Sequence, residues 1–240
     1  MLREGLADSR ASASALIRAG KVLVDDGPVD KPGTRVQPEA TIRVRGGRRF
    51  VSRGGEKLAG ALEDLGIDVR GRRVLDLGAS TGGFTDCLLQ AGAAAVAAVD
   101  VGYGQLAASL RDDPRVVVLE RTNARHLDPA ALPFVPDLVT VDVSFISVRL
   151  LLAQMRNLAP GAEWLILVKP QFEVGRERVG RGGVVRDDAL RGQAASDVAS
   201  EASRLGYVEV GRCESRLPGP KGNREIFLQL QPRGAESGGR

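Results

Sequence analysis

The chain has 240 residues, of which 43% are hydrophobic, 27% charged and 4% aromatic, with a net charge of +4. This length accommodates one α/β domain of roughly 150–200 residues and a small additional module. No apolar run approaches the roughly 18 residues that cross a membrane, and no signal-peptide core follows the first residues, so we expect a cytoplasmic protein. The two cysteines, Cys87 and Cys213, are far apart and are expected to be free thiols.

The positive charge is concentrated in the first quarter of the chain. Residues 1–57 hold 12 Lys and Arg against 7 Asp and Glu, whereas the remaining 183 residues hold 22 against 23. Affinity for nucleic acids depends largely on contacts with phosphates, so a basic module ahead of a near-neutral domain predicts a polyanionic partner. A basic face that only keeps the protein soluble is the alternative.

Residues 1–45 are predicted to form a compact α+β unit. Ser9 can cap a helix that ends at Gly20. A strand at 21–24, turns at 25–28 and 31–34, and a short strand at 42–44 follow. The segment 46–53 is rich in Gly and Arg and is expected to be the interdomain linker.

The rest of the chain alternates between strand and helix patterns. A helix is expected over 56–65 and a longer one over 187–205. Strands are expected near 73–77, 95–99, 115–119, 137–141, 163–168, 207–213 and 225–230. Such alternation predicts a parallel sheet with helices on both faces, and the last two strands suggest a hairpin. We expect one domain over 54–231 and a disordered tail over 232–240.

A glycine-rich turn follows the first strand of this domain. A helix opening near Gly83 would point its free amide groups at a bound ligand. The turn has neither the Gly-Lys-Ser/Thr ending of a P-loop nor G-x-G-x-x-G spacing, and instead resembles the first motif of S-adenosylmethionine-dependent methyltransferases. Another nucleotide ligand or a plain tight turn stays open as an alternative. The candidate cofactor-binding residues here are Gly78, Ala79, Ser80, Thr81, Gly82, Gly83 and Phe84.

Two further candidate cofactor-binding residues follow the next two strands. Asp100 is placed to accept hydrogen bonds from a ribose diol, and Asn123 to reach an adenine. The alternative is that both side chains only cap the helices that follow them.

Four charged residues are predicted to converge beside the glycine-rich turn. Asp142 and Lys169 end the fourth and fifth strands, Glu225 begins the last strand, and Lys57 lies at the amino end of the helix before the first strand. The carboxyl ends of parallel strands meet at one edge, where an antiparallel strand begins. Each residue alone fits a surface charge or a salt bridge, but their convergence favours a catalytic group.

Two stretches carry a resemblance to known families. Residues 5–10, 16–22 and 29–33 resemble the S4-type RNA-binding module of a small-subunit ribosomal protein and of many RNA-modifying enzymes. The Lys-Asp-Lys-Glu set resembles the tetrad of FtsJ-like ribose 2′-O-methyltransferases, and nearly the whole chain resembles the TlyA family of ribosomal RNA methyltransferases, once known as haemolysins. The motifs that carry this second resemblance lie at 51–58, 76–86, 100–106, 121–123, 142–147 and 169–175.

The resemblance implies a class I methyltransferase fold, a Rossmann-like seven-stranded sheet with an antiparallel last strand, behind a small α+β S4-type domain. It implies S-adenosylmethionine as cofactor and ribosomal RNA as partner, with a cytidine ribose as the expected target. Neither a metal nor an obligate protein partner is expected. The residues expected to contact RNA are Arg10, Arg18, Lys21, Arg48 and Arg53.

The chemistry of 2′-O-methylation requires these residue types. A ribose hydroxyl must lose its proton as it attacks a methyl group, and a lysine acts as a base only when its pKa falls well below about 10.4. We therefore assign Lys169 as the base, with Lys57 as a neighbouring cation. Asp142 and Glu225 would orient the amines and the hydroxyl.

Other features leave alternatives open. The basic loop over 175–186 either closes over RNA, with Phe145 or Phe172 stacking on a base, or is a solvated surface loop. His126, the single histidine, is expected to have no role. Competing functions are a non-catalytic ribosome-assembly factor, a methyltransferase for small molecules, and a membrane-active haemolysin, which the lack of an apolar segment disfavours.

Overall fold

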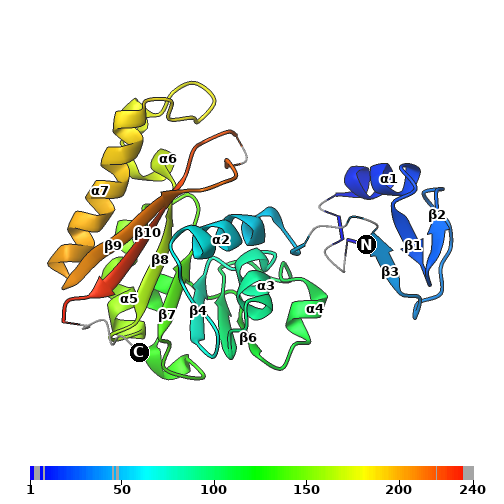
Figure 1. The fold of residues 1–240 in the computed structure, drawn as a ribbon, viewed down its shortest axis with the longest axis horizontal. Helices are drawn as coiled ribbons and strands as arrows, with labels where there is room; N and C mark the ends of the chain where they lie inside the picture. The colour runs from blue at the N-terminus through cyan, green and yellow to red at the C-terminus, as the bar shows by residue number, and fades with distance from the viewer. Residues whose placement is uncertain (3–5, 8, 45, 47–48, 220, 235–240) are drawn as a thin grey trace.

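The computed structural model describes all residues of the chain except 3–5, 8, 45, 47–48, 220 and 235–240. Figure 1 shows a small unit formed by the first residues and a larger unit built on a central sheet. Within the described residues, no helix is both long and apolar enough to span a membrane.

The small unit consists of one helix and a three-stranded antiparallel sheet. Helix α1 (Arg10–Arg18) precedes strands β1 (Val22–Val24), β2 (Gly27–Val29) and β3 (Ile42–Val44), in the sheet order β2-β1-β3. As predicted, Ser9 caps α1, because its Oγ accepts a hydrogen bond from the amide of Ser12 at 3.1 Å.

The turn predicted over 25–28 is shorter than expected. Asp25 and Asp26 both have positive φ, which is what a two-residue hairpin turn requires, and aspartate tolerates this conformation. Gly27 and Pro28 therefore belong to strand β2. Proline fits there because β2 is an edge strand, where a missing amide donor leaves no ladder bond unmade.

The large unit is a seven-stranded sheet in the order β6-β5-β4-β7-β8-β10-β9, in which β10 is antiparallel to both of its neighbours. This arrangement confirms the predicted fold class. Its strands are β4 (Arg73–Leu77), β5 (Ala95–Val99), β6 (Val116–Leu119), β7 (Leu138–Val141), β8 (Glu163–Val168), β9 (Tyr207–Glu214) and β10 (Ile226–Pro232). Its helices are α2 (Arg53–Asp64), α3 (Gly83–Gln90), α4 (Ala108–Arg111), α5 (Leu152–Leu158), α6 (Pro170–Glu173) and α7 (Asp188–Arg204), with 3-10 turns η1 (Ala124–His126), η2 (Pro129–Ala131), η3 (Val148–Leu150) and η4 (Arg176–Arg178).

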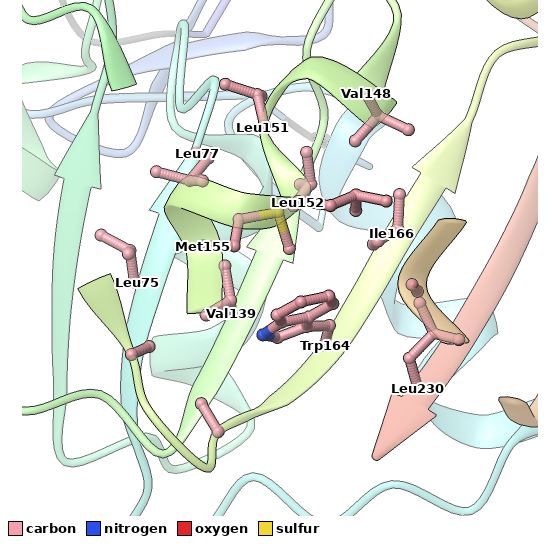
Figure 2. Packing of buried hydrophobic residues seen from close by; sticks show 14 of the residues in the cluster. Leu75, Leu77, Val139, Val148, Leu151, Leu152, Met155, Trp164, Ile166 and Leu230 are labelled. Carbon is pink, nitrogen blue, oxygen red and sulfur yellow. The ribbon is translucent and has the colours of Figure 1, made fainter. Parts of the chain in front are cut away.

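Helices cover both faces of this sheet. On one face, side chains of α5 and α7 pack around Trp164 in a cluster, part of which is shown in Figure 2. On the other face, α2, α3 and α4 pack on alternate residues of the same strands. Because Leu75 and Leu77 face one layer and Val74 faces the other, β4 is buried from both sides.

The segment expected to be a linker is partly packed against the large unit. Phe50 is 2% exposed, and the amide of Val51 donates to Asp86 Oδ2 in α3 at 2.8 Å. Helix α2 begins at Arg53, three residues before the predicted start, because Ser52 caps it. The domain boundaries predicted at residues 46–53 stay predictions, and so does the disordered tail predicted over 232–240. Within that tail, Pro232 lies in β10 and residues 235–240 fall outside the described residues.

Helices α2 and α3 approach closely through glycines. A Cβ on Gly83 would lie 2.2 Å from Ser52 Oγ and 2.9 Å from the amide nitrogen of Gly55. A Cβ on Gly55 would lie 2.4 Å from the Phe50 side chain. A glycine at position 83 is therefore required for the close packing of α2 against α3.

Replacing Gly83 by alanine should destabilise the fold by about 1–3 kcal/mol, because the added methyl group overpacks the α2–α3 contact. Denaturant unfolding followed by the fluorescence of Trp164, the only tryptophan, measures this change in the free energy of unfolding. Gly192→Ala in α7 is the matched control, since no atom of the described residues beyond its own helix turn lies within 4 Å of its Cβ position. It should be neutral or stabilising by up to about 1 kcal/mol. Equal effects of the two substitutions would refute the packing role.

One carboxylate is buried in the layer between the sheet and α3. Asp76 in β4 is fully buried and accepts hydrogen bonds from Thr85 Oγ1 at 2.7 Å and Thr140 Oγ1 at 3.0 Å. Burial raises the pKa of Asp76 to about 6, although the two hydroxyl groups partly offset this effect. Asp76 thus connects β4, β7 and α3 directly beneath the glycine-rich turn.

The raised pKa of Asp76 predicts a defined pH dependence of stability. Between pH 4 and 6 the unfolded chain loses this proton while the folded protein keeps it, so stability falls as pH rises and stays lower above pH 6. The shift from 3.8 to about 6 corresponds to about 3 kcal/mol. The side chain introduced by Asp76→Asn cannot titrate, so the variant should not lose this stability as the pH rises. In urea titrations, the free energy of unfolding of the variant minus that of the wild type should therefore increase by about this amount between pH 4 and 7.

The control for this experiment is Asp68→Asn. Arg70 lowers the pKa of Asp68 to about 2, so the stability that Asp68 contributes is lost as pH falls, the opposite direction. If the difference in free energy of unfolding between the wild type and Asp76→Asn does not change with pH, the pKa of Asp76 is not raised and this prediction is wrong.

Candidate active site

A cavity of about 1060 Å³ opens at the edge of the large sheet where the parallel strands end. Its wall is formed by the amino end of α2, the turn after β4, the loop after β7, the segment after β8 and the loop before β10. All four residues of the predicted tetrad line it: Lys57, Asp142, Lys169 and Glu225. The chain-direction argument therefore placed them correctly, while their individual roles stay predictions.

Lys57 and Glu225 form a buried ion pair. Lys57 is 7% exposed and Glu225 is fully buried, and Nζ lies 2.5 Å from Oε2. The second oxygen, Glu225 Oε1, is buried and has no hydrogen-bond partner among the described residues, although Glu225 lines the cavity. A buried acceptor without a partner is costly, so a donor group that reached this oxygen would stabilise the site.

Lys169 and Asp142 form the second ion pair. Lys169 Nζ lies 2.6 Å from Asp142 Oδ1 and donates an aligned hydrogen bond to Ser144 Oγ at 2.8 Å. The Lys169 side chain is 11% exposed and that of Asp142 is 23% exposed. The two lysines thus have separate carboxylate partners, and the side chains of Asp142 and Lys169 remain accessible from the cavity.

The glycine-rich turn lies beside these pairs. Gly78, Ser80 and Gly82 all have positive φ, and a Cβ on Gly78 would lie 2.7 Å from the carbonyl oxygen of Asp142. Gly82 precedes α3, and no side chain among the described residues caps this helix. Its amino end, with Gly83 and Phe84, borders the cavity, so amide groups are available to a bound ligand.

The two other predicted cofactor-binding residues do not line this cavity. Asp100 accepts hydrogen bonds from the amides of Ser80 at 2.8 Å and Gly102 at 2.7 Å, which fixes the glycine-rich turn against the loop after β5. Asn123 is exposed and caps η1 through the amide of Arg125. The capping alternative therefore describes Asn123, and contact of either residue with a cofactor stays a prediction.

An aromatic pair stands on the rim of the cavity. Phe145 is 88% exposed and has positive φ, an uncommon conformation for a bulky residue that is found mainly at functional sites. Its ring centroid lies 5.5 Å from that of Phe172, at a tilt of 51°. Both rings line the cavity, so a planar group entering it would meet an aromatic surface.

Glu173 holds the Phe145 loop in place. This carboxylate, 9% exposed, accepts hydrogen bonds from Ser147 Oγ at 2.5 Å and from the amide of Val148 at 2.7 Å. It belongs to α6, which directly follows Lys169. The loop with Ser144 and Phe145 is therefore fixed to the segment that carries Lys169.

The residues predicted to contact RNA fall into two places. Arg10, Arg18 and Lys21 are exposed on the small unit. Arg53 begins α2, lines the cavity and donates to the carbonyl of Pro218 at 3.1 Å. Arg48 lies outside the described residues.

Several polar residues of the cavity were not among the predicted site residues, and Ser144 and Asn223 are two of them. Ser144 contacts Lys169, and Asn223, 3% exposed, binds the backbone of the loop that follows η4. Ser144 follows Asp142 by two positions and Asn223 precedes Glu225 by two. This proximity in sequence to the tetrad is the pattern that could have indicated them. His126 is exposed at the end of η1 and does not line the cavity. No group of three or more His, Cys, Asp or Glu among the described residues is arranged to hold a metal ion.

Comparison with known proteins identifies both units. Residues 50–231 match the family model of the FtsJ-like methyltransferases, and residues 1–42 match that of the S4 domain. The chain is 54% identical to the 16S/23S rRNA (cytidine-2′-O)-methyltransferase TlyA of Mycobacterium tuberculosis over 96% of this chain and 87% of that protein. It is also 40% identical to Hemolysin A of Brachyspira hyodysenteriae over 95% of both proteins.

A solved structure agrees with these relatives. A Streptococcus thermophilus protein described as a hemolysin superimposes with a TM-score of 0.75 at 37% identity, covering 97% of this chain and 86% of that one. The arrangement of an S4 domain before an FtsJ-like methyltransferase domain, together with these identities, shows that the chain belongs to the TlyA family.

Proposed function

We propose that this protein transfers the methyl group of S-adenosylmethionine to the 2′-hydroxyl of a cytidine ribose in ribosomal RNA. The observation that carries the proposal is the convergence of two lysine–carboxylate pairs, Lys57–Glu225 and Lys169–Asp142, beside the glycine-rich turn. The name of the M. tuberculosis relative supports the reaction and the cytidine target.

The cavity has features suited to the methyl donor. S-adenosylmethionine, when bound, supplies an activated methyl group on a positively charged sulfur. Residues 78–84 would hold it through backbone amides and the uncapped amino end of α3. A cavity of about 1060 Å³ slightly exceeds the range of about 300–1,000 Å³ for small-molecule sites, which leaves room for a nucleotide as well.

The tetrad would manage the proton of the ribose hydroxyl. Lys169 is the group that takes this proton, while Asp142 and Ser144 fix the position of its Nζ. Glu225 Oε1 can accept the hydroxyl hydrogen bond and so orient the nucleophile, held in place by Lys57 on Oε2. Fixing the hydroxyl in line with the reacting methyl group would supply much of the rate enhancement.

RNA would reach the cavity across both domains. The S4 domain presents Arg10, Arg18 and Lys21, and Arg53 stands at the cavity itself. Phe145 and Phe172 offer a surface on which a base could stack once its nucleotide has left the helix. Since ribosomes are assembled in the bacterial cytoplasm, we propose that the protein acts there.

Lys169→Ala should lower the rate of methyl transfer by about 10²–10⁴-fold, because a positioned base is lost. The assay measures transfer from labelled S-adenosylmethionine to unmodified bacterial ribosomal subunits. Reverse-transcription stops at low nucleotide concentration locate the modified ribose. Lys169→Arg is the matched variant: it keeps the charge beside Asp142 but cannot give up a proton, so it should be equally inactive.

Calorimetry of donor binding and sedimentation with subunits must show that both variants still bind their ligands. An active Lys169→Arg variant would refute the role of Lys169 as the base. A wild-type protein that binds donor and subunits but transfers no label would refute the catalytic proposal and leave an assembly factor.

Phe145→Ala should raise the KM for ribosomal subunits by about 5- to 150-fold, because base–aromatic stacking contributes about 1–3 kcal/mol. Donor affinity should not change, and Phe145→Tyr should retain the wild-type KM. Val135→Ala, which removes another exposed apolar side chain before β7, is the control for nonspecific effects. A wild-type KM for Phe145→Ala would contradict the stacking role.

A further inference from the structure

We infer that a second, basic cleft beside the active-site cavity binds the phosphodiester backbone of the RNA next to the target nucleotide. The cleft encloses about 470 Å³ between the segment 184–191 and the loop 221–224. This inference rests on the proposed function for the identity of its ligand. The residues that line the cleft are Val184, Val185, Arg186, Asp188, Arg191, Lys221, Gly222 and Arg224.

The two loops that form the cleft are fixed to each other by Asn223. Its side-chain Oδ1 accepts from the amide of Val185 at 2.9 Å, and its Nδ2 donates to the carbonyl of Gly183 at 2.8 Å. Gly180 and Val184 form an additional antiparallel bridge within the first loop. This part of the basic loop is therefore held in place by Asn223, while closure over RNA and a solvated surface loop both stay predictions.

The charge of the cleft is strongly positive. Four of its lining residues are cations and one, Asp188, is an acid, which is paired with Arg191. Arg224 is paired with Glu214 on β9. Arg186 and Lys221 are exposed, and neither has an ion-pair or hydrogen-bond partner for its side chain among the described residues. Two unneutralised cations across one cleft suit an anion with several acceptor oxygens.

The position of the cleft identifies the anion as a phosphodiester. Lys221 lines both the basic cleft and the active-site cavity, so the two spaces are adjacent. Asn223 also borders the cavity, two residues before Glu225. A ribose held between Lys169 and Glu225 carries backbone phosphates on both sides, and a neighbouring phosphate can therefore reach Lys221 and Arg186.

The test uses the full-length double variant Arg186→Gln/Lys221→Gln and a fluorescein-labelled oligocytidine. If two phosphate contacts are lost, the slope of log affinity against log salt should become shallower by about 1.4, at about 0.7 per contact on a single strand. The KM for unmodified ribosomal subunits should rise about tenfold with little change in kcat. The charge-retaining variant Arg186→Lys/Lys221→Arg should behave as the wild type.

Arg156→Gln/Arg204→Gln is the matched control, because it removes two exposed charges from α5 and α7, outside the cleft and the cavity. If the slope of log affinity against log salt is the same for Arg186→Gln/Lys221→Gln as for this control, the cleft does not bind the RNA backbone, even when methyl transfer is observed. If instead the slope changes as expected but the wild type methylates no RNA, the cleft stands and the proposed reaction fails. Displacement of oligocytidine by millimolar inorganic phosphate as effectively as by RNA would also overturn the assignment to the RNA backbone.

Discussion

The buried ion pair between Lys57 and Glu225 is the contact on which the rest of the site depends. It joins the first helix of the methyltransferase domain to the start of its last strand, 168 residues later in the chain. Removing one partner of such a buried pair typically costs about 3–5 kcal/mol, because the other charge is left without compensation. The glycine contacts between α2 and α3 and the antiparallel entry of β10 both serve to bring these two side chains together.

Around this pair the cavity has three functionally distinct parts. The turn after β4 and the amino end of α3 offer backbone amides, which suit the methyl donor. Lys169, Asp142 and Ser144 form a hydrogen-bonded group at the ends of β7 and β8, which suits proton transfer. The exposed Phe145 loop, fixed by Glu173, forms the rim toward the nucleic acid. All three parts follow the ends of strands β4, β7 and β8 of one sheet, so the sheet positions them relative to one another.

The sequence predicted the strands and the site edge well, because both follow from short-range patterns and chain direction. The alternation of strand and helix patterns marked the parallel strands, and the direction of each strand decided which end of it reaches the cavity. Pairing within the site was not predictable in this way. Strand ends are located to within several ångströms, whereas a hydrogen bond depends on rotamers and on loop geometry, so the partners of Lys57 and the contact of Ser144 with Lys169 appeared only in the structure.

The glycines illustrate the same limit. Gly83 was predicted to bind the cofactor, but its tightest neighbours are atoms at the start of α2, which was placed three residues too late. Likewise, the sequence of the loop 175–186 shows flexibility and charge, but its attachment to Asn223 requires a partner more than 35 residues away. Contacts of this range follow from the assembled fold and are not encoded in a local pattern.

The place of β10 in the sheet has a consequence for biosynthesis. This strand follows every other strand in the chain, yet it lies between β8 and β9. While the nascent chain emerges from the ribosome, β9 has no strand to pair with and one edge of β8 stays open. Glu225 arrives with β10, so its ion pair with Lys57 forms only when that insertion closes the sheet.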